Sequence, residues 1–298
     1  MGRLCSLALI AFSPVLGQGQ APPPVFRSEV KLVRLLATVK DFNGTLIGGL
    51  DKSDFTITDN GVPQEIAVFE RYTEQPLSIA VLLDTSASIA KDLKFATASL
   101  KRFLHAVIQE GNPRDEASLF TFNHDVSQHT GFTRRIQQIE NRVKPLKAEA
   151  GTSLYDAIYL ASQSLESREG RRVILIVTDG GDTTSHYGYH DALKAAHMVD
   201  APIYSLLLMP ILNDAGRNIG GENALTTLGQ STGGRLFTPT VGAELDAALA
   251  EILKDLRTQY LIGYYPRNIP VTKEKFHTIR VELPRRDLRA ATRSGYYE

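Results

Sequence analysis

Residues 77–88 read LSIAVLLDTSAS, and this stretch decides how the middle of the chain folds. Its first seven residues are almost all apolar, as in a strand that is buried on both faces of a sheet. After them come the carboxylate of Asp84 and the hydroxyls of Ser86 and Ser88, at alternate positions. Oxygen ligands of this kind suit hard cations such as Mg²⁺, Mn²⁺ or Ca²⁺. The stretch therefore predicts a buried strand with metal ligands at its carboxyl end.

Two later stretches provide oxygens at corresponding places. Asp179 ends the apolar run at residues 173–177, and Thr152 stands where a helical segment begins. In an open α/β sheet, ligands bind outside the carboxyl ends of the strands. Five residues are thus predicted to meet around one cation: three that bind it through hydroxyls and two that offset its charge. They are Ser86, Ser88 and Thr152, and Asp84 and Asp179.

The octahedral preference of Mg²⁺ leaves room in this set for one more oxygen. An aspartate or glutamate carboxylate of a protein partner is a natural sixth ligand. The predicted site therefore resembles a docking device more than a closed structural centre.

Strand and helix periods alternate through the centre of the chain. Three apolar runs, at residues 79–83, 173–177 and 203–209, are separated by stripes at intervals of three and four residues. The stripes predict helices around residues 93–107, 154–165 and 245–256. Such alternation predicts an α/β fold with a doubly wound, Rossmann-like and mostly parallel sheet. Residues 116–122 and 126–130 are expected to add an antiparallel hairpin at its edge.

Both flanks of this central region have the period-two pattern of strands. Strand candidates include residues 260–265 and 291–297 near the end of the chain. Each flank is too short to bury a core alone. We therefore expect residues 25–75 and 258–298 to pair into one small β-rich subdomain beside an α/β domain at residues 76–257.

The first 19 residues fit a secretory signal peptide: Arg3, then an apolar stretch, then small residues. A membrane anchor is the alternative, but about 20 apolar residues are needed to span the hydrocarbon, and Pro14 interrupts the run earlier. The mature chain is therefore expected in the periplasm or outside the cell, without a membrane span. Cys5, the single cysteine, lies in the signal segment. Lys and Arg total 33 and Asp and Glu also 33, so no bulk charge favours nucleic acid as a partner.

Simpler roles exist for single residues of the predicted site. Ser88 can cap the following helix, and Thr152 or Ser153 can cap the helix that starts near Leu154. Three loops in register favour the metal site over a plain turn. Asp182 is better explained as a solvated loop carboxylate and is left out of the site.

Histidines offer a second possible metal site. His186, His190 and His197 are spaced to align on one helix face. Gly188 weakens that helix, and zinc sites need a clear helix or cysteine partners. Surface histidines are the preferred interpretation.

The motifs of several enzyme classes are missing. No Gly-x-Gly-x-x-Gly follows the first central strand, and no Gly-x-x-x-x-Gly-Lys occurs, which argues against dinucleotide binding and against a nucleotide triphosphatase. Phosphatases that resemble haloacid dehalogenases need a second aspartate where this chain has Ser86. The sequence therefore predicts a protein that is not an enzyme.

Asp84-x-Ser86-x-Ser88, then Thr152, then Asp179-Gly180 together resemble the metal-ion-dependent adhesion site of von Willebrand factor type A (VWA) domains, across residues 77–257. The flanks are similar to a bacterial family of VWFA-related proteins known largely from Acidobacteria. The matching flank motifs are Asp54-Phe55, Asp59-Asn60-Gly61, Tyr264-Tyr265-Pro266 and Gly295-Tyr296.

This resemblance implies Mg²⁺-dependent protein binding without catalysis. Ala87 stands where many relatives have glycine, a change that should leave metal binding intact. The predicted function is a secreted adhesion-type module that captures an acidic side chain of a protein partner. A scaffold whose metal only rigidifies three loops is the first alternative, and a metal-assisted hydrolase is the second.

Overall fold

The centre of the protein is a six-stranded sheet. The computed structural model describes residues 32–71, 74–143, 146–208, 218–270 and 275–297. Along the sheet the order is β10-β9-β8-β5-β6-β7, and every neighbouring pair is parallel except β6 and β7. The strands are β5 (Leu77–Asp84), β6 (Glu116–Phe122), β7 (Val126–Gln128), β8 (Arg171–Thr178), β9 (Ile203–Leu207) and β10 (Arg235–Phe237). The predicted mostly parallel sheet with an antiparallel edge hairpin is confirmed.

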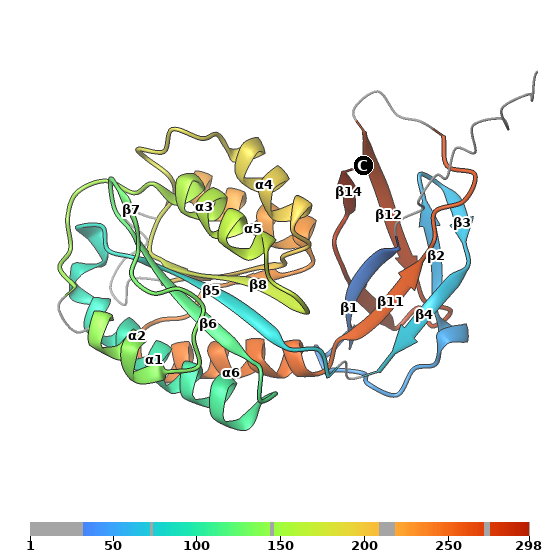
Figure 1. Ribbon diagram of the computed structural model, residues 1–298, viewed down its shortest axis with the longest axis horizontal. Coiled ribbons are helices and arrows are strands. Elements are labelled where there is room, and N and C mark those ends of the chain that lie inside the picture. The colour runs from blue at the N-terminus through green and yellow to red at the C-terminus, as the bar shows by residue number, and fades with distance from the viewer. Residues whose placement is uncertain (1–31, 72–73, 144–145, 209–217, 271–274, 298) are drawn as a thin grey trace, which may run out of the picture. The chain divides into compact units, whose positions relative to one another are not determined.

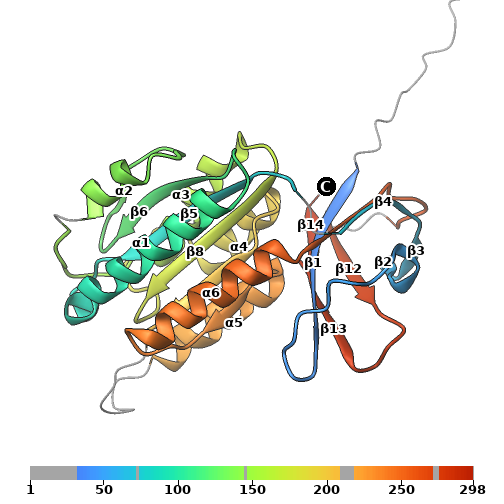
Figure 2. The ribbon, with the colours of Figure 1, turned by 90° about the horizontal axis from the view of Figure 1, so that it is seen from below.

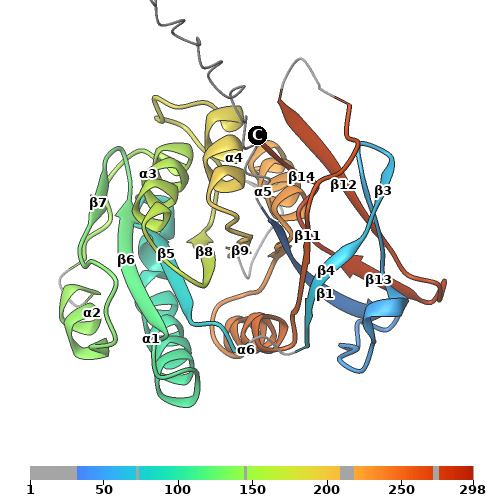
Figure 3. The same cartoon turned by 45° about the vertical axis from the view of Figure 1, so that its right-hand side comes forward.

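Helices cover both faces of this sheet (Figures 1 and 3). On one face lie α1 (Leu93–Glu110), α2 (Ile136–Val143) and α6 (Ala243–Arg257). The other face carries α3 (Leu154–Glu166), α4 (Tyr189–Met198) and α5 (Ile219–Thr232). The three predicted helical stripes became α1, α3 and α6. Figure 2 shows α1 and α6 running alongside each other.

Alternate residues of β5 pack into two separate cores. Ile79, Val81 and Leu83 belong to the cluster under α1 and α6, whereas Ala80 and Leu82 belong to the cluster under α3, α4 and α5. Successive side chains of a strand point to opposite faces. A strand between two helical layers is therefore apolar at successive positions, as residues 79–83 are.

Strands from the two flanks form two further four-stranded sheets. One sheet has the order β13-β1-β11-β4 and the other β14-β12-β2-β3, so each combines strands from both flanks. These strands are β1 (Val33–Asp41), β2 (Thr56–Asp59), β3 (Val62–Gln64), β4 (Ile66–Glu70), β11 (Tyr260–Tyr264), β12 (Phe276–Glu282), β13 (Leu288–Ala291) and β14 (Gly295–Tyr297). A third apolar cluster fills the space between them. The predicted β-rich subdomain built from both flanks is confirmed.

One expected strand is divided. Residues 291–297 were predicted as a single strand, but β13 ends at Ala291 and β14 starts at Gly295. Arg293 between them pairs with Thr232 in an isolated β-bridge, and the Ser294 N–H donates to the Ser231 carbonyl at 2.8 Å. These bonds to the end of α5 draw the backbone out of the sheet, which a local sequence pattern does not reveal.

Residues 31–298 form one compact unit. The predicted boundaries near residues 76 and 257 therefore remain predictions. The predicted signal peptide, residues 1–19, lies outside the described residues. In the ranges that the structure covers, none of the helices has the length and apolar character needed to cross a membrane.

Candidate metal centre

The predicted ligands lie where two parallel strands end. β5 and β8 are direct neighbours, paired from Leu77 with Arg171 to Leu83 with Val177. Asp84 is the last residue of β5, and Asp179 directly follows Thr178 at the end of β8. Because carboxyl ends of parallel strands meet at one edge of the sheet, the two carboxylates reach the same place.

Hydrogen bonds connect four of the five predicted residues. The hydroxyls of Ser86 and Ser88 are 3.0 Å apart, and the Ser88 hydroxyl donates to Asp179 Oδ1 at 2.9 Å. Asp84 Oδ1 accepts the Ser86 backbone N–H at 2.7 Å. The four residues therefore form one connected group of oxygens drawn from two loops.

Thr178 supports this group, although it was not among the predicted ligands. Its hydroxyl donates to Asp84 Oδ2 at 2.5 Å and accepts the Gly180 N–H at 3.2 Å. Thr178 therefore fixes the orientation of the Asp84 carboxylate and the start of the loop after β8. Its position directly before Asp179 is the only sequence signal for this role.

Thr152 lies on a third loop that is bonded to the other two. The Glu149 N–H donates to the Thr85 carbonyl at 2.9 Å, and the Thr152 carbonyl accepts the Thr183 N–H at 2.8 Å. The Thr152 N–H in turn donates to the Thr183 hydroxyl at 2.9 Å. In the described residues, no hydrogen bond joins the Thr152 hydroxyl to the other four predicted ligands. Its loop is in place, and its role as a ligand remains a prediction.

The capping alternatives can be compared with the observed bonds. Ser88 is the first residue of a short 3-10 helix, Ser88–Lys91, and α1 begins only at Leu93, so Ser88 does not cap α1. Ser153 holds the N-cap position of α3, but its hydroxyl donates to the His124 carbonyl at 2.8 Å instead of capping. Asp182 accepts the Tyr155 N–H at 3.3 Å and the Ser185 hydroxyl. This carboxylate fastens its loop to α3.

Electrostatics distinguish the two site carboxylates from ordinary surface groups. Asp84 has an exposed fraction of 0%, and burial raises its pKa to about 6 from an ordinary 3.8. Burial also raises the pKa of Asp179, against the lowering effect of the Ser88 hydrogen bond. Neither carboxylate forms an ion pair with a described lysine or arginine. A buried carboxylate beside a second, partly buried one is costly without a cation, and a divalent cation would offset that cost.

The donor set fits a hard cation. It contains only carboxylate and hydroxyl oxygens, the ligands that Mg²⁺, Mn²⁺ and Ca²⁺ accept and that zinc and copper sites rarely use alone. Across the described ranges, no group of three or more His, Cys, Asp or Glu side chains is arranged to hold a metal. The candidate centre has two carboxylates and relies on hydroxyls, so it is of a different type.

The histidine stretch gives one correction. His186 and His190 are exposed, as expected for surface histidines. His197 is not: only 3% of it is exposed, and its ring packs edge-on against Phe276 and Tyr297. The surface interpretation was wrong for His197 because strands of the C-terminal flank cover the end of α4.

Two glycines bring α5 against the loop after Asp179. A Cβ on Gly181 would come within 2.6 Å of Gly221 Cα. The Gly221 N–H donates to the side chain of Asn218, the N-cap of α5, at 2.9 Å. Only glycine permits this approach of two backbones. α5 escaped prediction because it is rich in glycine, with Gly220, Gly221 and Gly229.

One further sequence motif lies at the end of α5. Residues 229–233 read GQSTG, which has the Gly-x-Ser-x-Gly spacing of a hydrolase nucleophile elbow. Here the motif ends α5, with Gly233 in the left-handed conformation at the C-cap. A nucleophile elbow instead joins a strand to a helix. The motif therefore does not create a nucleophile at this position.

Comparisons with known proteins agree with this fold. The sequence pattern of the von Willebrand factor type A domain matches residues 79–181. Among curated protein sequences, none matches this chain.

Among solved structures, the vWF domain of the type V pili tip protein Mfa5 from Porphyromonas gingivalis is similar, with 13% identity and a TM-score of 0.50, over 60% of this chain and 94% of that one. Proximal thread matrix protein 1 of the mussel byssus has 14% identity and a TM-score of 0.50, and the match covers 62% of this chain and 49% of that one. The protein BatB from Bacteroides thetaiotaomicron has 18% identity and a TM-score of 0.49, and the match covers 60% of this chain and 98% of that one.

At these identities the structural likenesses show the fold alone, and the fold is shown by the first two structures. The sequence match covers β5, β6, α3 and β8, the elements that carry the candidate centre. Residues 79–181 of this chain therefore match the von Willebrand factor type A domain, and the fold of the central sheet agrees with that match.

Proposed function

We propose that this domain captures an acidic side chain of a protein partner through a divalent cation, Mg²⁺ first and Mn²⁺ or Ca²⁺ as alternatives. The VWA domain indicates an adhesion or protein-interaction module. The observation that carries the finer proposal is the connected group of Asp84, Ser86, Ser88 and Asp179, with one buried and one partly buried carboxylate and no described lysine or arginine paired with either.

Each residue has a distinct task in this proposal. Ser86, Ser88 and Thr152 offer neutral hydroxyl oxygens, and Asp84 and Asp179 supply the negative charge that balances a divalent ion. Thr178 keeps the Asp84 carboxylate in place from behind. When bound, the cation would supply a free coordination position for the partner's carboxylate.

The same proposal includes a location and an absence of catalysis. The N-terminal segment predicts secretion to the periplasm or the medium, and Mfa5, one of the similar structures, is a pili tip protein. We infer that the protein binds rather than converts its partner, because a bound cation would engage the hydroxyls and carboxylates of the candidate centre as ligands.

Metal binding can be tested without knowing the partner. Titration of the purified protein with Mn²⁺, followed by its effect on water proton relaxation, should show one site for which Mg²⁺ competes. Asp179→Ala and Asp84→Asn should each remove this site. Asp125→Ala is the matched control, since it removes an exposed carboxylate from a neighbouring loop. Equal Mn²⁺ binding by all four proteins would refute the metal centre.

The free coordination position has its own test. Addition of acetate or a short aspartate peptide to the Mn²⁺ form should displace metal-bound water and lower the relaxation effect, whereas a matched asparagine peptide should not. If Mn²⁺ binds but both peptides leave the relaxation unchanged, the metal is structural and the capture proposal fails.

A further inference from the structure

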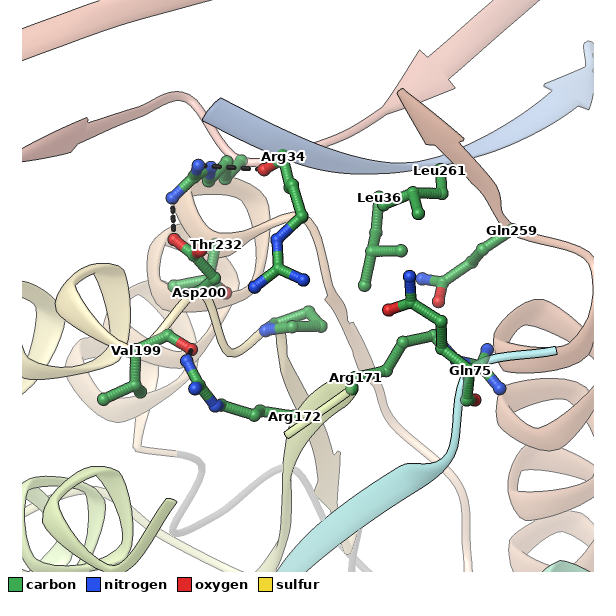
Figure 4. Close-up of a pocket in the computed structure, with 14 residues that line it drawn as sticks. Arg34, Leu36, Gln75, Arg171, Arg172, Val199, Asp200, Thr232, Gln259 and Leu261 are labelled. Carbon is green, nitrogen blue, oxygen red and sulfur yellow. Dashed lines mark hydrogen bonds and ion pairs between the residues drawn. The ribbon is translucent and has the colours of Figure 1, made fainter. Parts of the chain in front are cut away.

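A pocket rich in arginine lies at the opposite end of the sheet from the candidate metal centre. It surrounds the amino end of β8, where Arg171 and Arg172 begin the strand. Its volume is about 40 Å³. Figure 4 shows the side chains around it. Four arginines line the pocket with a single carboxylate, and they are Arg34, Arg171, Arg172 and Arg293, with Asp200.

Most of this positive charge is met by neutral groups. Arg171 donates to the carbonyls of Gln75 and Leu256, and Arg172 donates to those of Val199 and Arg168. Carbonyl oxygens satisfy the hydrogen bonds of a guanidinium group, but they do not cancel its charge. These two arginines therefore add positive charge to the pocket, and Asp115 and Glu166, which lie outside the lining, offset part of it.

Arg293 holds the only carboxylate of the lining. It forms an ion pair with Asp200 and donates to the Arg34 carbonyl at 2.9 Å. The Arg34 guanidinium itself makes no hydrogen bond or ion pair with a described residue and repels Arg172 across the pocket. One negative charge thus faces four positive ones in a chain whose total charges are balanced.

Two buried polar atoms of the lining have no partner. Arg293 is 7% exposed, and its Nε, a donor, forms no hydrogen bond with the described residues. Gln259 is 1% exposed, and its Oε1, an acceptor, is likewise unsatisfied. In Figure 4, Gln259 and Arg34 reach toward the same space from opposite sides. Leaving a buried polar group without a partner is unfavourable, so we expect a ligand or water to bond these two atoms.

We propose that this pocket binds one small oxyanion that carries a hydroxyl group, of the hydrogen phosphate class. Anionic oxygens match the guanidinium donors of Arg34 and Arg293 in charge and geometry. The hydroxyl supplies the donor that Gln259 Oε1 lacks. Sulfate and chloride carry the charge without that donor. The small volume favours the free ion over a phosphate attached to a larger group.

Ordered water is the competing occupant. A cavity of this size is large enough for water, and water can bond both unpaired atoms. It cannot offset the excess positive charge. Water and oxyanion therefore predict different responses to added phosphate.

Calorimetric titration of the full chain with inorganic phosphate tests the proposal, in buffer with EDTA and at constant ionic strength. One-site binding is expected, with sulfate at least about tenfold weaker. Glycerol phosphate, which carries a bulky substituent, should bind more weakly than the free ion. Thermal unfolding should show the same order of stabilisation by these anions.

Variants link the binding to this pocket. Arg34→Gln should weaken phosphate binding about tenfold or more, and the exposed position of Arg34 makes loss of folding no concern. Arg114→Gln is the matched control, because it removes another exposed arginine that lies outside the pocket. Absence of phosphate binding, equal affinity for sulfate, or unchanged affinity in Arg34→Gln would each overturn the proposal.

Discussion

Acidification should weaken the folded protein through one buried imidazole, that of His197 near the end of α4. Its exposed fraction is 3%, and its Nδ1 forms no hydrogen bond with the described residues. The ring packs against Phe276 and Tyr297, with centroid distances of 5.5 and 6.3 Å. Burial, with help from the nearby Arg293 charge, lowers the pKa of His197 to about 4, while a hydrogen bond with the Gly295 backbone opposes the shift.

The magnitude follows from the two pKa values. In the unfolded chain His197 should have its ordinary pKa of 6.5, against about 4 when folded. Between these values the unfolded state binds a proton that the folded state does not, so the free energy of unfolding falls as the pH falls. At about 1.4 kcal/mol per pH unit, the full loss is about 3 kcal/mol, of which about 2 kcal/mol is reached at pH 5. Above pH 6.5 the contribution of His197 is fully present.

Urea unfolding at several pH values from 8 to 4.5, in EDTA, measures this effect. His197→Gln should remove it, so the difference between the two proteins isolates the contribution of His197. The comparison is necessary because Asp84 acts with the opposite sign: its pKa is raised to about 6 on folding, so it gains stability as the pH falls below that value.

His190→Gln is the matched control, since it removes an exposed imidazole from the same helix. Its pH profile should follow that of the unaltered protein, because water solvates this side chain in both states. If the profile of His197→Gln also stays parallel to that of the unaltered protein from pH 8 to 4.5, the linkage argument is refuted.

Two further predictions concern the cores. Asp59 is fully buried and accepts hydrogen bonds from the Tyr264 and Tyr296 hydroxyls at 2.7 and 2.9 Å. Asp59→Ala should therefore lower the free energy of unfolding, measured by urea titration, by about 3 kcal/mol. A loss below about 1 kcal/mol would show that the two hydroxyls find other acceptors. Leu82 in β5 is 0% exposed. Leu82→Ala should lower the free energy of unfolding by about 3 kcal/mol in the same urea titrations. A loss below about 0.5 kcal/mol, as for a surface substitution, would contradict the position of Leu82 between the helical layers.

Local patterns predicted the α/β part well. Apolar runs buried on both faces and helical stripes are properties of short windows, and they located β5, β8, α1, α3 and α6. The candidate site was also within reach of the sequence. A carboxylate or hydroxyl directly after a parallel strand lies at a known edge of the sheet, so Asp84 and Asp179 could be brought together from their positions alone.

Elements that depend on partners far along the chain were harder to predict. The division of residues 291–297 into β13 and β14 follows from the bonds of Arg293 and Ser294 to the end of α5. The burial of His197 follows from strands of the C-terminal flank. Thr178 supports Asp84 only because β5 and β8 became neighbours.

The sequence by itself determined the alternation of strands and helices, the pairing of the two flanks and the oxygens at the strand ends, because each follows from side-chain periodicity or chain length. Only the tertiary structure decided which polar groups are buried and which charges face each other. The arginine pocket is the clearest case, since Arg34 and Arg293 lie 259 residues apart and the Arg293 guanidinium donates a hydrogen bond to the Arg34 carbonyl. Burial and charge balance are properties of the assembled chain, and no local pattern of residues encodes them.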